Sequence, residues 1–166
     1  MDQAKSIALL NAAVADELQA VHQYMYFHFH LDDQGFGPLA ALFKRIAIME
    51  MGHVERLAER ILFLKGDVKM ELAGPVEPVQ DAEAMLKKAA GMEEQSAKDY
   101  NKMALECAAN ADSASKQIFE QLVMDEEQHF DIFDKQMENI RRFGPSYLAL
   151  QSFNAAPDAA PGGGGA

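Results

Sequence analysis

The sequence has almost no cysteine. Its 166 residues include a single one, Cys107. One thiol cannot form an internal disulfide framework, and it cannot supply the ligands of a cysteine-rich zinc or iron–sulfur site. We expect Cys107 to be a small buried side chain near the end of a helix rather than a reactive thiol.

Positive charge and long apolar runs are also scarce. The chain has 15 Lys+Arg against 26 Asp+Glu, a formal net charge of −11. Nucleic-acid-binding surfaces need clustered basic residues, so this class of protein is disfavoured. No apolar run approaches the roughly 18 residues of a membrane span, and residues 1–5 do not begin a signal peptide. We therefore expect a cytoplasmic protein without membrane segments, whose acidic surplus suits the handling of cations.

Few glycines and prolines interrupt the chain, and between them apolar residues recur at helical spacing. The expected helices are residues 4–33, residues 38–65 with Gly66 as the terminating residue, a third from the N-cap Asp81 to about residue 109, a fourth from the turn at 110–112 to about residue 143, and a short fifth at 147–153. These elements form one domain, residues 1–153. Residues 154–166 are rich in Gly, Pro and Ala, and we expect them to be disordered.

The lengths of the connections predict how these helices pack. Helices of about 30 residues in a small domain lie side by side as a bundle. The first and third connections are short, so each joins antiparallel neighbours. The middle connection, residues 67–80, can span roughly 46 Å when extended, which is enough to run the length of the bundle. Two hairpins joined by one long crossover predict an all-α, ferritin-like four-helix bundle.

Two of the expected helices carry a Glu-x-x-His motif. The second helix contains Glu50 and His53, and the fourth contains Glu126 and His129. Residues three apart lie on the same helical face, so both side chains of each motif can reach one metal ion. A single pair of this kind is common on solvated helices, but two copies in one bundle indicate a shared metal centre.

Equal spacing selects the carboxylates that the other two helices contribute. Glu17 precedes Glu50 by 33 residues, and Glu93 precedes Glu126 by the same number. The neighbouring Glu94 is rotated by about 100° from that face. A tyrosine, Tyr24 or Tyr100, follows each of these two glutamates by seven residues. We expect the tyrosines to donate hydrogen bonds to buried carboxylates.

The predicted donor set has four carboxylates and two imidazoles, which suit Fe, Mn or Zn. Four ionised glutamates balance the +4 of two divalent ions, and that balance is needed because an uncompensated buried charge is costly. We expect Glu50 and Glu126 to bridge two metal ions, Glu17 and Glu93 to be terminal ligands, and His53 and His129 to bind one ion each. Without metal, mutual repulsion should raise the pKa of some of these carboxyl groups.

The motifs resemble those of bacterioferritins. Residues 50–53 followed by the run Glu-Arg-Ile-Leu-Phe-Leu-Lys-Gly at 59–66 resemble the second helix of that family, residues 125–129 its fourth, and residues 144–148 the start of its short fifth. The resemblance covers about residues 5–153. It implies a ferroxidase that oxidises Fe²⁺ with O₂ or H₂O₂ at a di-iron centre inside each subunit. It also implies a hollow cage of 24 subunits that stores ferric mineral, with a ferredoxin-type protein as a candidate reductant.

The resemblance gives Met51 a role of its own. Met51 lies about 100° from Glu50 on the helix, so it points away from the metal centre. In bacterioferritins the methionine at this place binds a b-type haem on a two-fold axis; the alternative is a packing methionine at an interface. Arg45 and Met49 depart from the pattern, since some bacterioferritins have a His and an Asp there that bind a further iron on the cavity wall.

Other interpretations remain open. A ferritin-like di-iron or di-manganese oxidase or peroxidase without storage is one; its rubrerythrin form usually has a Cys-rich segment, which one cysteine cannot supply. A twelve-subunit mini-ferritin that protects DNA is another, but its site normally lies between subunits. A helical scaffold without catalysis is a third, and the repeated ligand pattern argues against it.

Overall fold

The computed structural model describes residues 1–152, and in this range it contains helices and no strands. Five helices follow one another along the chain: α1 (Gln3–Asp33), α2 (Gly37–Phe63), α3 (Ala82–Ala109), α4 (Ser113–Phe143) and α5 (Pro145–Leu150). None of them is long and apolar enough to cross a membrane. The expected all-α fold with a short fifth helix is confirmed, although α5 begins and ends earlier than expected. The predicted disordered tail lies outside the described residues.

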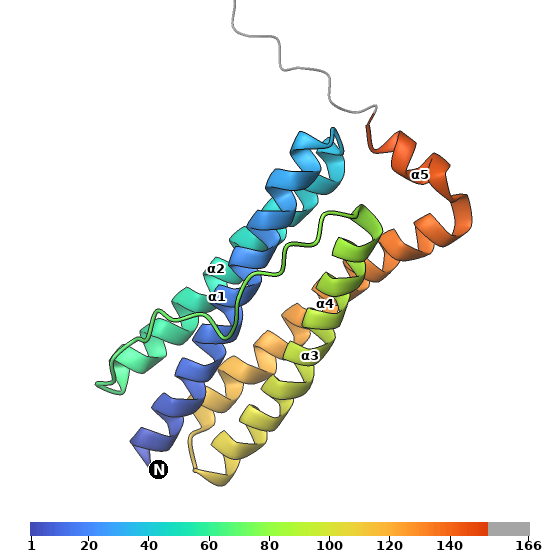
Figure 1. Ribbon diagram of the computed structural model, residues 1–166. Coiled ribbons are helices and arrows are strands. Elements are labelled where there is room, and N and C mark those ends of the chain that lie inside the picture. The colour runs from blue at the N-terminus through green and yellow to red at the C-terminus, as the bar shows by residue number, and fades with distance from the viewer. Residues whose placement is uncertain (153–166) are drawn as a thin grey trace, which may run out of the picture.

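The four long helices form two antiparallel hairpins. The helix α1 packs mainly against α2, and α3 packs mainly against α4. The connection between α2 and α3, green in Figure 1, runs along the outside of α1 from one end of the bundle to the other. This is the long crossover that the sequence predicted, and it confirms the ferritin-like topology.

The end of α2 differs from the expectation. Lys65, and not Gly66, adopts the left-handed conformation, with φ of 62°. The amide of Gly66 donates to the carbonyl of Ile61 and that of Lys65 to Leu62, which is the Schellman pattern. Gly66 is needed for a different reason, because a Cβ atom there would lie 2.9 Å from the side chain of Ile7 on α1.

A row of side-chain amides on α1 holds the crossover in place. Asn11, Gln19 and Gln23 each pair with the backbone of the crossover through both the oxygen and the nitrogen of the amide. Gln23 is fully buried; it accepts from the amide of Glu77 at 2.8 Å and donates to the carbonyl of the same residue at 3.0 Å. The side-chain amides thus give the extended backbone of the crossover hydrogen-bond partners that a neighbouring strand would otherwise supply.

Replacing Gln23 with Leu should destabilise the protein by about 1–3 kcal/mol, because it removes both hydrogen bonds of a fully buried side chain and turns an apolar group toward the amide of Glu77, whose carbonyl keeps the amide of Val79 as a partner. We expect the melting temperature of the metal-free protein to fall by roughly 2–12 °C at equal protein concentration. Gln19→Leu is the matched control. Gln19 is only half-buried, so water can replace its contacts and the fall should be much smaller. Equal melting temperatures for the two variants would contradict this account.

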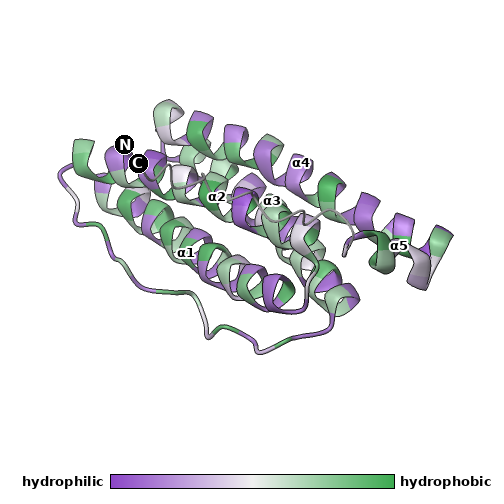
Figure 2. Cartoon of the chain, turned by 90° about the horizontal axis from the view of Figure 1, so that it is seen from above, coloured by the Kyte–Doolittle hydropathy of each residue, from purple (hydrophilic) through white to green (hydrophobic). Residues whose placement is uncertain are grey.

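The apolar core has two parts, one toward each end of the bundle. One is built around Phe27, Phe43 and Phe133, and the other around Leu57, Phe119 and Leu122. The amphipathic pattern of the helices, seen in Figure 2, directs these side chains inward. The predicted burial of Cys107 in the second part is confirmed. Buried polar side chains lie in the bundle as well, and they form the candidate site.

Candidate metal centre

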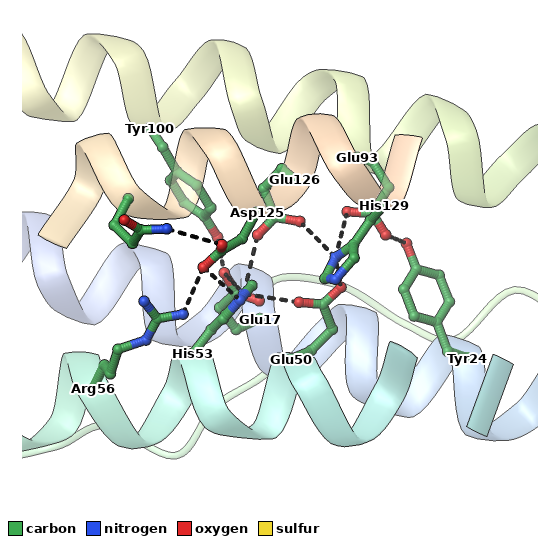
Figure 3. A network of polar contacts seen from close by, with 11 residues as sticks. Glu17, Tyr24, Glu50, His53, Arg56, Glu93, Tyr100, Asp125, Glu126 and His129 are labelled. Atoms are coloured by element: carbon green, nitrogen blue, oxygen red, sulfur yellow. Dashed lines mark hydrogen bonds and ion pairs between the residues drawn. The ribbon is translucent and has the colours of Figure 1, made fainter. Parts of the chain in front are cut away.

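The structure brings six of the singled-out side chains to one place inside the bundle (Figure 3). Each of the four long helices contributes at least one of them, and all six are at most 3% exposed. They are Glu17 from α1, Glu50 and His53 from α2, Glu93 from α3, and Glu126 and His129 from α4. The neighbouring Glu94 points outward instead and pairs with Lys98 on the surface. The spacing argument therefore selected the glutamate of α3 that lies inside.

The six side chains form two overlapping groups. In each group, one possible ligand atom per residue lies within 4.8 Å of the others. The first group contains Glu17 and His53 and the second contains Glu93 and His129, while Glu50 and Glu126 belong to both.

The shared glutamates present different oxygens to the two groups. The Oε2 of Glu50 lies 2.8 Å from Nδ1 of His53, and its Oε1 lies 2.9 Å from Nδ1 of His129. Likewise, Oε1 of Glu126 lies 3.1 Å from Nδ1 of His53, and its Oε2 lies 3.4 Å from Nδ1 of His129. This arrangement gives two adjacent positions, each with one histidine, one glutamate of its own and two shared glutamates.

Several of these buried polar atoms have no hydrogen-bond partner among the described residues. They are both carboxylate oxygens of Glu50, Oε1 of Glu126, Nδ1 of His53 and both ring nitrogens of His129. The Nδ1 of His53 also lies within 3.3 Å of three separate carboxylate oxygens, although it can offer at most one proton. Unpaired buried polar atoms are costly, so this cluster needs cations between its members. The residues present therefore fit two divalent ions.

Without metal, protons must balance the charge of the cluster. Burial and the carboxylate of Glu126 raise the pKa of Glu17 well above its usual value, and burial and Glu50 do the same for Glu93. Burial would lower the pKa of His129, but its contacts with Glu126 and Glu50 outweigh burial and raise it to about 9. The metal-free centre thus holds protonated carboxyl groups and cationic imidazoles.

The two tyrosines connect the hairpins crosswise. The hydroxyl of Tyr24 on α1 donates to Oε1 of Glu93 on α3, and that of Tyr100 on α3 donates to Oε1 of Glu17 on α1, the latter at 2.8 Å. Burial and the nearby carboxylates raise the pKa of both phenols, so they stay protonated and can only donate here. Each tyrosine therefore orients one of the two glutamates that belong to a single ligand group. The sequence predicts that the tyrosines donate to buried carboxylates, but it does not predict which tyrosine contacts which glutamate.

Two residues at the site were not singled out from the sequence. Asp125 on α4 lies beside His53, and its Oδ2 is 3.4 Å from Nε2 of that ring. Arg56 on α2 donates to the same oxygen at 2.7 Å. Asp125 precedes Glu126 in the motif, so its place next to a ligand was visible, but sequence periodicity does not reveal which histidine it contacts.

The remaining residues of interest lie on the outside of α2. Met51 is 54% exposed, and Arg45 and Met49 are exposed as well. Met51 borders an open apolar hollow of about 700 Å³ together with Leu18, Val21, Ile48 and Met70. These side chains are separate from the six that form the metal centre.

Comparisons with known proteins agree with this geometry. Residues 7–143 match the family described as Ferritin-like domain. The bacterioferritin of Rhodobacter capsulatus is 38% identical over 93% of this chain and 94% of its own length. That of Desulfovibrio desulfuricans is 36% identical over 89% of this chain and 82% of its own.

A crystal structure of the Desulfovibrio desulfuricans bacterioferritin, which describes its diiron site in different catalytic states, superimposes with a TM-score of 0.90. It is 33% identical and covers 99% of this chain and 96% of that one. The matches to sequence and structure span nearly the whole chain. The chain therefore belongs to the ferritin-like family, and within it to the bacterioferritins.

Proposed function

We propose that this protein oxidises Fe²⁺ to Fe³⁺ at the buried centre and stores the ferric product in a cage built from copies of the chain. The pair of overlapping ligand groups that share Glu50 and Glu126 is the observation that carries this proposal. The relatives named above are bacterioferritins, and one of them has a diiron site. Iron is both the ion that fits the centre and the substrate that passes through it.

Each ligand has a proposed part. Glu50 and Glu126 would be shared by the two ions, because each presents one oxygen to each position. Glu17 with His53, and Glu93 with His129, complete the two positions. Two Fe²⁺ ions held side by side supply two electrons, which reduce O₂ to H₂O₂ with two protons or H₂O₂ to two waters with two protons.

The protein around the ions keeps this chemistry contained. The aromatic contacts of Phe43 and Phe133 with Tyr24 close one side of the centre, and Tyr100 against Phe119 closes the other. The tyrosine hydroxyls hold Glu93 and Glu17 in place. Carboxylates oriented in this way would be ready to hold iron without rearranging.

Storage requires assembly, and we propose a homo-oligomeric cage of 24 subunits in the cytoplasm. Large apolar side chains are exposed on several helices, among them Phe29, Phe63, Leu105 and Leu150. Exposed apolar surface of this kind suits contacts between subunits. Release of stored iron needs electrons, for which a ferredoxin-type protein is the candidate donor.

Aerobic loading with Fe²⁺ tests the proposal. We expect the purified protein to elute as a large assembly and to hold far more than two irons per chain after repeated additions. A di-iron or di-manganese oxidase or peroxidase of the same fold would oxidise Fe²⁺ but keep no mineral. Two irons per chain and no mineral would therefore contradict storage, and an Fe²⁺ oxidation rate equal to that of buffer would contradict the ferroxidase activity.

We also propose that Met51 binds haem between two subunits. The exposed thioether beside an apolar hollow has the soft donor and the apolar surroundings that a haem needs, and a second copy of the chain can supply the opposite ligand. Bound there, the haem would offer a redox group at the protein surface, away from the di-iron centre.

Met51→Leu should abolish haem binding, because leucine keeps the bulk of methionine and lacks its sulfur. We expect the Soret band of protein expressed with a haem supply to disappear in this variant. Met124→Leu is the control, since Met124 on α4 is exposed to a similar degree, 56% against 54%. A Soret band of equal intensity in Met51→Leu and in the unaltered protein would exclude Met51 as the ligand.

A further inference from the structure

The two histidines differ in the contacts of their Nε2 atoms, which lie on the edge of the ring away from the carboxylates. The Nδ1 atoms of His53 and His129 face the carboxylates in the same way. On the opposite edge of the ring, Nε2 of His53 lies 3.4 Å from Oδ2 of Asp125, whereas Nε2 of His129 is buried and has no hydrogen-bond partner among the described residues. Figure 3 shows Asp125 between His53 and Arg56.

The carboxylate of Asp125 is itself held in place. Arg56 donates to its Oδ2 at 2.7 Å, and Gln121 donates to its Oδ1 at 3.1 Å. The two donors come from different helices, α2 and α4, and they approach different oxygens. A carboxylate fixed by two donors is a suitable support for a histidine, since its position does not depend on the histidine itself.

The internal repeat of the chain explains why, among residues 1–152, His53 has this support and His129 does not. The two hairpins repeat the ligands at an offset of 76 residues, so that Glu50 corresponds to Glu126 and His53 to His129. At the same offset, Asp125 corresponds to Met49, Gln121 to Arg45 and Arg56 to Ile132. Neither Met49 nor Ile132 can accept or donate a hydrogen bond of this strength. The two hairpins therefore share the same ligand residues, but they differ in the residues that would support the ligand histidine.

We infer that Asp125, fixed by Arg56 and Gln121, is a positioning residue for His53 and makes the His53 metal position the tighter of the two. This inference rests on the proposed metal centre. A metal ion on Nδ1 would leave the proton of the imidazole on Nε2, which lies 3.4 Å from Oδ2 of Asp125. The contact fixes the ring and its tautomer and increases the basicity of Nδ1. His129 receives no such support, so its position binds metal more weakly.

The test isolates each position with a variant that removes the other histidine. His129→Ala leaves the His53 position complete, and His53→Ala leaves the His129 position complete. Metal-free protein is titrated with Co²⁺ and followed by its visible absorption, which reports binding rather than activity. Asp125→Asn should lower Co²⁺ affinity by roughly 10- to 100-fold in the His129→Ala background, and it should leave the affinity unchanged in the His53→Ala background.

Asp131→Asn is the matched control, because Asp131 lies on the same helix, is exposed and contacts Lys135 instead of the centre. It makes the same chemical change and should leave the affinity of both backgrounds unchanged. If Asp125→Asn lowers the affinity equally in both backgrounds, or in neither, the inference is wrong while the metal centre stands. If the unaltered protein binds no Co²⁺, the proposed centre fails, and the inference fails with it.

Discussion

Glu50→Gln should lower the initial rate of Fe²⁺ oxidation by roughly 100-fold or more. Glu50 is the fully buried residue whose two oxygens face Nδ1 of His53 and of His129, at 2.8 Å and 2.9 Å. A glutamine keeps the size of the side chain, but it removes a negative charge and turns an NH₂ group toward one of the two ions. Replacing a residue that only supports a metal ligand typically lowers metal affinity or activity by about 10- to 100-fold. Replacing a ligand shared by both metal positions should therefore lower the oxidation rate by more. Stopped-flow absorbance after mixing with Fe²⁺ in air measures the rate.

The control for this variant is Glu94→Gln. Glu94 follows a proposed ligand directly, makes its ion pair with Lys98 at the surface, and is exposed. It should change the rate by less than twofold. The metal-free form of Glu50→Gln should melt at a lower temperature than the unaltered protein, because the substitution removes a carboxylate that faces two cationic imidazoles inside the bundle. A Glu50→Gln protein that oxidises Fe²⁺ within a few-fold of the normal rate would exclude the bridging role.

The sequence alone predicts a large part of this arrangement. Helical periodicity fixes which face of a helix is buried, and a motif such as Glu-x-x-His fixes which side chains share that face. The equal spacing of 33 residues favours Glu93 over Glu94, and Glu93 lies inside the bundle. The long crossover followed from the reach of an extended chain.

The sequence does not predict which side chains of different helices contact one another. The pairing of Tyr24 with Glu93 and of Tyr100 with Glu17 depends on how far each hairpin slides along the other, and no periodicity specifies that shift. The contact of Asp125 with His53 has the same origin.

The end of α2 shows a local limit of another kind. Glycine after a helix is the usual sign of a left-handed residue, but here Gly66 serves the close approach of Ile7, and Lys65 adopts the left-handed conformation. A residue 59 positions earlier in the sequence, Ile7 on α1, decides which residue must be small. Local preference is thus overridden by packing.

Binding of two divalent ions should release at least two and up to four protons per chain at pH 7. In the metal-free centre, burial raises the pKa of Glu17 and Glu93, and contacts with carboxylates raise the pKa of His53 to about 12 and that of His129 to about 9 despite burial. The two histidines hold a proton each at pH 7 and the two carboxyl groups hold up to two more, and the two ions displace these protons. Titration of weakly buffered metal-free protein with Zn²⁺, followed with a pH indicator, measures the release.

The same protons make metal affinity depend strongly on pH. A release of four protons for two ions corresponds to about a 100-fold rise in the average affinity per ion for each pH unit, over the range in which the groups remain protonated without metal. The affinity should rise with pH because protons and metal ions compete for the same atoms. Glu17→Gln removes one ionisable carboxyl group whose pKa is raised by burial, so this variant should release fewer protons than the unaltered protein.

The stability of the metal-free protein should change in the opposite direction. A carboxyl or imidazole group whose pKa is higher in the folded than in the unfolded chain contributes stability at low pH and loses it as the pH rises through the folded value. All four groups, Glu17, Glu93, His53 and His129, have this sign. Between about pH 5 and 9, we therefore expect the metal-free protein to melt at falling temperatures while the Zn²⁺-loaded protein does not. A constant difference between the two melting temperatures across this range would mean that these protons are not held at the metal centre, because the groups that the ions displace are the ones that widen that difference.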